Sequence, residues 1–171
     1  MRFLLHTQKV NVESRDKLGQ TALSKAVQSG KISIVKLLLN VKNINVNSSS
    51  LSGRTTLSYA AEKGNMSVFE LLLRLPETEM DSADDPGKTP FFYAVCYGHI
   101  DIVKLLLRSP EIDVDHRNSF GHTPLSAAAL HGHESAVKLL LDTNNVDTNA
   151  QDNKGRTPKS FAAEHRHTGV V

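Results

Sequence analysis

Apolar and polar residues follow one another in this chain in a pattern that recurs every 34 residues. Short apolar stretches with helical spacing are separated by polar segments that contain glycine. The apolar markers are five alanines and four leucine triplets at constant spacing: Ala26, Ala60, Ala94, Ala128 and Ala162, and residues 37–39, 71–73, 105–107 and 139–141. The glycines keep the same register: Gly19, Gly53, Gly87, Gly121 and Gly155. Such a period is typical of repeat proteins, in which each repeat buries its apolar face against its neighbours.

The repeat at residues 116–149 shows which elements the pattern predicts. Thr123 can serve as a helix N-cap, and Pro124 fits the first helical position, where its missing N–H costs nothing. Gly132 predicts a left-handed end for this first helix. A second amphipathic helix is predicted over residues 134–141. Helices this short are marginal alone in water, so the repeats must stack.

The register divides the chain into whole and partial repeats within one predicted domain, residues 1–171. The whole repeats are 14–47, 48–81, 82–115 and 116–149, and the partial ones are 1–13 and 150–171. The register also decides between two structures for residues 91–97, whose aromatic composition favours a strand. Because sister segments have helical spacing, we predict a helix there. Residues 3–5 lie 34 positions before a leucine triplet and are predicted to end an earlier second helix.

Composition and charge exclude several classes of protein. The net charge of +2 and a pI near 8.7 give no argument for nucleic acid binding. No apolar run approaches the roughly 20 residues that span a bilayer, so no membrane partner is expected. Cys96 is the sole cysteine, which excludes an internal disulfide. With no signal peptide visible, we expect an intracellular protein of the cytoplasm or nucleus.

The motif Gly-x-Thr-Pro-Leu-x-x-Ala-Ala, followed by Gly-His and Val-x-Leu-Leu-Leu, resembles the ankyrin repeat. It occurs in full in residues 116–149. The resemblance implies an all-α solenoid of helix-turn-helix repeats with short hairpin-like finger loops. It also implies a non-catalytic module that binds a protein or peptide through its concave face and finger tips. The 34-residue period, one longer than usual, resembles long fungal ankyrin arrays, so a larger array protein is expected.

The last repeat departs from this motif. Lys159 stands at a core leucine position, and Arg166 replaces the glycine that ends the first helix. One interpretation is a polar C-terminal cap, which a solenoid needs for solubility. The other is an array cut within a repeat. At the other end, an N-terminal face without an outer partner suggests self-association.

The family's contact positions give the candidate binding residues. The residue before each capping threonine forms a mostly basic column: Gln20, Arg54, Lys88, His122 and Arg156. Such a column favours an acidic or phosphorylated partner, although ordinary solvated charges would look the same. Aromatic and apolar residues on the first helices and finger tips add Tyr59, Tyr93, Tyr97, Phe120, Leu130 and His131. Tyr59 and Tyr93 alternatively pack between repeats. The predicted partner-binding set is Arg54, Tyr59, Lys88, Tyr93, Tyr97, Phe120, His122, Leu130 and His131.

Catalytic and metal chemistry find little support. No nucleophile elbow, zinc-protease motif or complete phosphate-binding loop occurs, so no catalytic residue and no cofactor are predicted. His131, His133, His165 and His167 suggest zinc, but His133 and His167 fill the family's structural Gly-His position, and we predict no metal. The alternative function is an enzyme or small-molecule site in the aromatic groove of repeats three and four, with His131 or His122 as acid–base. A closed pocket with a buried histidine and carboxylate would support it.

Overall fold

The structure is a computed structural model that describes residues 11–170. Within that range all regular secondary structure is helical, apart from an isolated bridge between Ser49 and Thr55. The chain forms two compact units, an N-terminal unit of residues 1–79 and a C-terminal unit of residues 80–171. A single domain over residues 1–171 stays a prediction. The expected helix end at residues 3–5, and the face it would offer for self-association, lie outside the described residues.

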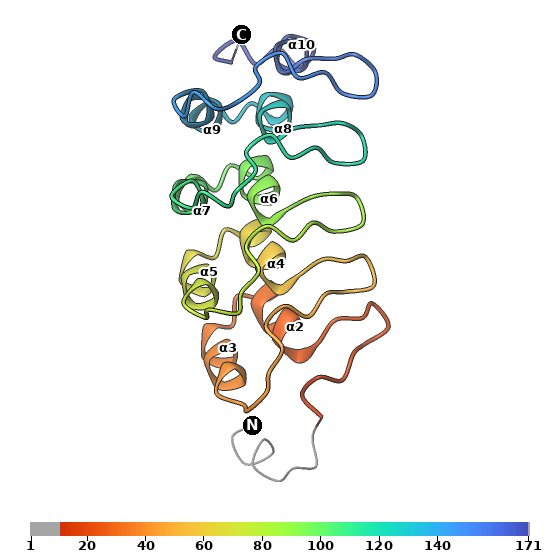
Figure 1. Ribbon diagram of the computed structural model, residues 1–171, viewed down its shortest axis with the longest axis vertical. Coiled ribbons are helices and arrows are strands. Elements are labelled where there is room, and N and C mark those ends of the chain that lie inside the picture. The colour runs from red at the N-terminus through yellow and green to blue at the C-terminus, as the bar shows by residue number, and fades with distance from the viewer. Residues whose placement is uncertain (1–10, 171) are drawn as a thin grey trace. The chain divides into compact units, whose positions relative to one another are not determined.

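The N-terminal unit contains two helical hairpins. Its helices are α2 (Ala22–Gln28), α3 (Ile32–Leu39), α4 (Thr56–Lys63) and α5 (Met66–Leu73). The first helices of the two repeats, α2 and α4, pack against each other and form one layer, while α3 and α5 form a second (Figure 1). The finger loops extend from the ends of the first helices.

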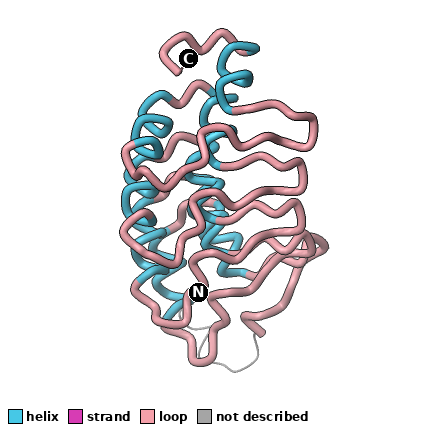
Figure 2. Tube along the Cα trace, turned by 45° about the horizontal axis from the view of Figure 1, so that its top comes forward, coloured by secondary structure: helices cyan, strands magenta, loops and turns pink. Residues whose placement is uncertain are grey.

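The C-terminal unit continues the same alternation. Its helices are α6 (Pro90–Cys96), α7 (Ile100–Leu106), α8 (Pro124–His131), α9 (Glu134–Leu141) and α10 (Pro158–Glu164). First helices α6, α8 and α10 pack in series, and α7 packs on α9 behind them. Figure 2 shows the finger loops of this unit side by side, leaving the helices in the same direction. Each unit is thus a stack of helix-turn-helix repeats, which confirms the predicted all-α repeat solenoid.

The predicted helix ends are confirmed. The Thr123 hydroxyl accepts a hydrogen bond from the Ser126 N–H at 3.2 Å, and Pro124 occupies the first turn of α8. Gly132 ends α8 with φ of 68°, a conformation that residues with a Cβ avoid. The aromatic segment of repeat three is a helix, α6, because the repeat register outweighs its local preference for strand.

The core explains the spacing of the leucine triplets. Only the middle leucine of each triplet is fully enclosed, with 0–1% of its surface exposed: Leu38, Leu72, Leu106 and Leu140. The five periodic alanines of the first helices are also buried, and their small side chains let the first helices of adjacent repeats approach closely. The 34-residue apolar pattern therefore marks the leucines and alanines that pack in the core of the stacked repeats.

Candidate protein-binding surface

A polar side chain at the base of each finger loop holds the loop backbone in place. In the C-terminal unit, Asn118 Oδ1 accepts hydrogen bonds from the N–H groups of Phe120 at 2.9 Å and His122 at 3.0 Å. This pattern fixes the backbone on which both predicted contact residues sit. Sequence reasoning missed these residues, although their signal is visible at the 34-residue spacing: Asp16, Ser50, Asp84, Asn118 and Asp152.

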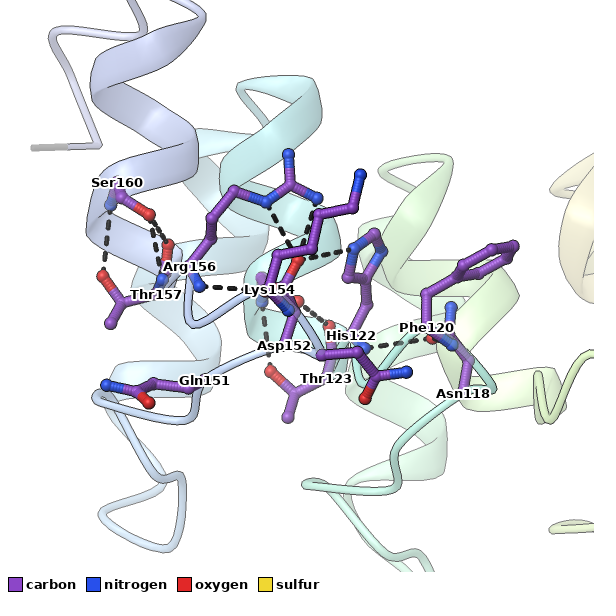
Figure 3. A network of polar contacts seen from close by, with 12 residues as sticks. Asn118, Phe120, His122, Thr123, Gln151, Asp152, Lys154, Arg156, Thr157 and Ser160 are labelled. Atoms are coloured by element: carbon purple, nitrogen blue, oxygen red, sulfur yellow. Dashed lines mark hydrogen bonds and ion pairs between the residues drawn. The ribbon is translucent and has the colours of Figure 1, made fainter.

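Asp152 extends this role into a charged network (Figure 3). Its side chain is only 2% exposed and contacts Arg156 through Nη2 at 2.8 Å and Nε at 3.0 Å. His122 Nε2 lies 3.4 Å from the same carboxylate oxygen. Burial acts to raise the pKa of Asp152, but the backbone N–H donors of Arg156 and Lys154 and the Arg156 guanidinium outweigh it and lower that pKa to about 2. The carboxylate is therefore ionised at neutral pH and balances the arginine.

The predicted basic column is largely engaged inside the protein. In the N-terminal unit, Arg54 Nη2 lies 2.7 Å from Glu62 Oε2, and both side chains are mostly buried. The same guanidinium lies 4.6 Å from the Tyr59 ring centroid. In the C-terminal unit, Arg156 Cζ lies 4.4 Å from the Phe161 ring centroid. These arginines cover aromatic rings of their own repeats, which is a favourable cation–π arrangement.

Tyr59 and Tyr93 have intramolecular partners as well. Tyr59 is 5% exposed, and its hydroxyl accepts a hydrogen bond from Gln20 Nε2 at 2.9 Å. Tyr93 is 7% exposed, and its hydroxyl donates to Asp84 Oδ2 at 2.5 Å. The Gln20 bond joins Tyr59 to the preceding repeat, as the alternative of packing between repeats expects, whereas the Asp84 bond holds Tyr93 within its own repeat. A partner-binding role for either tyrosine stays a prediction.

Three predicted contact residues of the C-terminal unit are open to solvent. Phe120 at a finger tip is 62% exposed and Tyr97 is 49% exposed, and His131 at the end of α8 is exposed too. Tyr97 stacks on His99 with ring centroids 6.3 Å apart. Leu130, in contrast, is partly buried against the cluster that includes Phe161. Leu130 therefore has a packing role in addition to any contact with a partner.

Lys88 lies close enough to His122 and His131 to lower the pKa of each imidazole. The Lys88 ammonium is 5.7 Å from the Tyr93 ring centroid. Burial lowers the pKa of His122, with Asp152 opposing and Lys88 adding to the decrease. His131 is exposed, but partial shielding of its imidazole from water lowers its pKa, and nearby positive charges including Lys88 lower it further. Lys88 is thus a fixed positive charge that acts on both imidazoles, with Arg156 also acting on His122, and both imidazoles favour their neutral forms.

The histidines of the Gly-His positions connect adjacent repeats. His133 Nε2 lies 2.9 Å from the Cys96 carbonyl oxygen, and His167 Nε2 lies 3.1 Å from that of Leu130. This is the structural hydrogen-bonding role expected from the sequence. Among residues 11–170, no group of three or more histidine, cysteine or acidic side chains is arranged to hold a metal ion.

The alternative of a catalytic groove gains little from the geometry. His122 does meet a buried carboxylate, but Asp152 is already occupied by Arg156. A hollow of about 220 Å³ in the C-terminal unit is lined mainly by apolar residues such as Leu125 and Val137 and contains neither predicted histidine. Burial raises the pKa of the Cys96 thiol, which keeps it in its unreactive form.

Stacked helical hairpins with hydrogen-bonded finger loops define a helical repeat protein. A family model described as ankyrin repeats (3 copies) matches residues 1–84, 50–118 and 110–171, and the chain belongs to the ankyrin repeat family. Members of this family are generally protein–protein interaction modules and typically non-catalytic. No curated protein matches the chain. Within residues 11–170, no helix combines the length and apolar character that crossing a bilayer requires.

Proposed function

We propose that the chain is a non-catalytic, intracellular protein-binding module whose C-terminal unit contacts its partner through Phe120, Tyr97 and His131. The observation that carries this proposal is the finger tip at Phe120. Its ring is 62% exposed, while its N–H is bound by Asn118 and its carbonyl oxygen accepts the Asn153 N–H at 3.0 Å. A large apolar ring is thus held in water by a fixed backbone.

Such a ring suits the centre of a binding interface. Aromatic residues carry much of the affinity of protein complexes when they are buried by a partner. A backbone fixed before binding loses little conformational entropy when the complex forms. Scattered exposed apolar residues need no explanation, but a phenylalanine that a hydrogen-bonded backbone holds at a finger tip favours a contact surface.

The charge of this surface supports an acidic partner segment. Fewer of the basic residues can attract it than the sequence suggested. Arg54 and Arg156 are paired with carboxylates, so they add little attraction for an acidic or phosphorylated peptide. Lys88 provides the fixed positive charge near His131. We therefore propose a peptide that places an apolar side chain on Phe120 and a carboxylate or phosphate near Lys88.

Capture from a cell extract with matched variants tests the proposal. The whole chain serves as bait, alone and as the double variant Phe120→Ala/Tyr97→Ala. Leu141→Ala is the control, because Leu141 is 44% exposed but lies on the outer helix α9. The protein retained by the wild type and the control should fall about tenfold with the double variant. Equal retention by all three, with unchanged thermal unfolding, would contradict the proposed surface.

A further inference from the structure

We propose that Leu18 and Leu51, at the tips of two adjacent finger loops in the N-terminal unit, form a second docking surface for a protein segment that pairs an apolar side chain with a carboxylate. These leucines are 63% and 76% exposed, the two most exposed large apolar residues among those described. They belong to a different compact unit from Phe120 and share no residue with the surface proposed around it. The inference is therefore independent of the proposed function.

The two leucines are held next to each other by the backbone. The Leu51 N–H donates to the Leu18 carbonyl oxygen at 2.9 Å, which joins the two tips. Gly19 makes room for this contact: a Cβ at that position would lie 2.7 Å from Leu51 N and 3.0 Å from Leu51 Cγ. The Leu51 side chain thus rests over the glycine that follows Leu18, which places the two exposed leucines at joined finger tips.

Polar contacts beneath the tips fix their shape. Arg15 Nη1 donates to the Gly19 carbonyl oxygen at 3.0 Å and also to that of Ser49, so one guanidinium joins both loops. Asp16 Oδ1 accepts the Leu18 N–H at 2.9 Å. Because these bonds exist before any partner arrives, docking would cost little ordering entropy.

The charges around the leucines favour an acidic neighbour. Asp16 is already paired with Lys25, Nζ to Oδ2 at 2.7 Å, and with backbone donors. Lys17, beside Leu18, is exposed. In the part of the chain that the structure describes, neither Lys17 nor Arg15 forms an ion pair with a carboxylate. An apolar surface with unneutralised positive charge at its edge complements an apolar side chain that has a carboxylate close by in sequence.

A peptide fits this surface better than an anionic membrane does. A single myristoyl chain gives only marginal, reversible membrane binding, and two leucine side chains offer less apolar surface than that chain. Two nearby cations add only a weak attraction to acidic lipids. A folded partner segment, in contrast, can enclose both leucines and exclude water from them.

Selection from a library of short random peptides, displayed on phage and applied to the whole chain, tests this proposal. We expect enriched peptides with leucine or phenylalanine next to aspartate or glutamate. One such peptide, labelled for fluorescence anisotropy, should bind about tenfold more weakly to Leu18→Ser/Leu51→Ser. Leu141→Ser and Phe120→Ala/Tyr97→Ala are the controls, and both should bind as the wild type does.

Several outcomes would overturn the inference. One is a selection that gives no acidic–apolar consensus, and another is a consensus peptide whose affinity is unchanged by Leu18→Ser/Leu51→Ser. Loss of binding with Phe120→Ala/Tyr97→Ala instead would assign the peptide to the other surface. Binding of the wild type to phosphatidylserine vesicles, with no peptide selected, would assign the leucines to a membrane. Because both leucines are exposed, thermal unfolding should be unchanged in the double variant, which separates lost binding from lost folding.

Discussion

Asp152 and Arg156 lie at the two ends of one finger loop, and their side chains meet through Nη2 at 2.8 Å and Nε at 3.0 Å. The carboxylate also accepts the Arg156 backbone N–H at 2.8 Å. One aspartate therefore both closes the loop and neutralises a residue that the sequence marked as a free positive charge. In this repeat the positive charge of Arg156 stabilises the finger loop and is not left free for a partner.

Replacing Asp152 should separate these two roles. Asp152→Asn keeps an oxygen that can accept the loop N–H groups, as Asn118 does one repeat earlier. Asp152→Ala removes that acceptor and leaves Arg156 without its partner. We expect a lower melting temperature for Asp152→Ala than for Asp152→Asn, measured by circular dichroism. Equal losses would mean that the loop does not depend on this acceptor.

Two phenylalanines with opposite surroundings should respond differently to truncation. Phe161, 1% exposed, belongs to the cluster beneath Leu130, and Phe161→Ala should cost about 3–5 kcal/mol of unfolding free energy. Phe120→Ala should change it by less than about 0.5 kcal/mol, because the ring is mostly in solvent. Urea unfolding measures both. A large loss with Phe120→Ala would identify Phe120 as a packing residue and remove the basis for the proposed surface.

His133 and His131 form a matched pair for testing the connection between repeats. His133 bonds to the Cys96 carbonyl oxygen at 2.9 Å, whereas His131 is exposed on the end of α8. We expect His133→Ala to cost about 1 kcal/mol and His131→Ala to cost less. The same denaturant titrations measure this difference. If His131→Ala costs as much, the hydrogen bond between repeats is not the source of the loss.

Arg166 offers a route to a more stable chain. Its φ of 59° is left-handed, whereas the sister positions carry glycine at 64–69°. The steric penalty for a residue with a Cβ is roughly 1–2 kcal/mol. Arg166→Gly should therefore raise stability by about 0.5–1 kcal/mol after the extra freedom of glycine in the unfolded chain is subtracted. Arg166→Ala is the control, since it keeps the Cβ and should show no such gain.

Acidification should destabilise the protein through His131. Partial shielding of the imidazole from water and nearby positive charges hold the pKa of His131 below its ordinary value of 6.5. The unfolded chain therefore binds a proton at this imidazole more readily than the folded protein, and stability is lost as the pH falls through 6.5 toward the lower folded value. His131→Gln should reduce the drop in melting temperature between about pH 7.5 and pH 5.5. An identical drop in the variant would exclude this cause.

The fold was predictable because its markers are periodic and local. Three markers recur in register: a capping threonine, a glycine after all but the last of the first helices, and a buried middle leucine in each triplet. Each of them has one structural interpretation. Even the strand-like composition of α6 was resolved by register. The repeat boundaries and the one-domain interpretation remain predictions.

The candidate surface was less predictable because it depends on side chains from different parts of the fold. The sequence placed Arg54 in a column of contact residues, but not that Glu62 would lie 2.7 Å away. The bonds of the Tyr59 and Tyr93 hydroxyls likewise depend on loop geometry. Phe120 was identified because it is a large apolar residue at a finger tip, and exposure is a property that one position can reveal.

The hydrogen bonds between neighbouring finger tips have a consequence for how these loops can change in length. In the C-terminal unit, the Ser119 N–H donates to the Pro86 carbonyl oxygen at 2.8 Å and the Asn153 N–H to that of Phe120 at 3.0 Å. Surface loops usually tolerate insertions and deletions. Here an added residue in one tip would disturb the tips on both sides of it. Insertions should therefore be accepted in the turns directly after the second helices, such as residues 143–145, and rejected at the fingers.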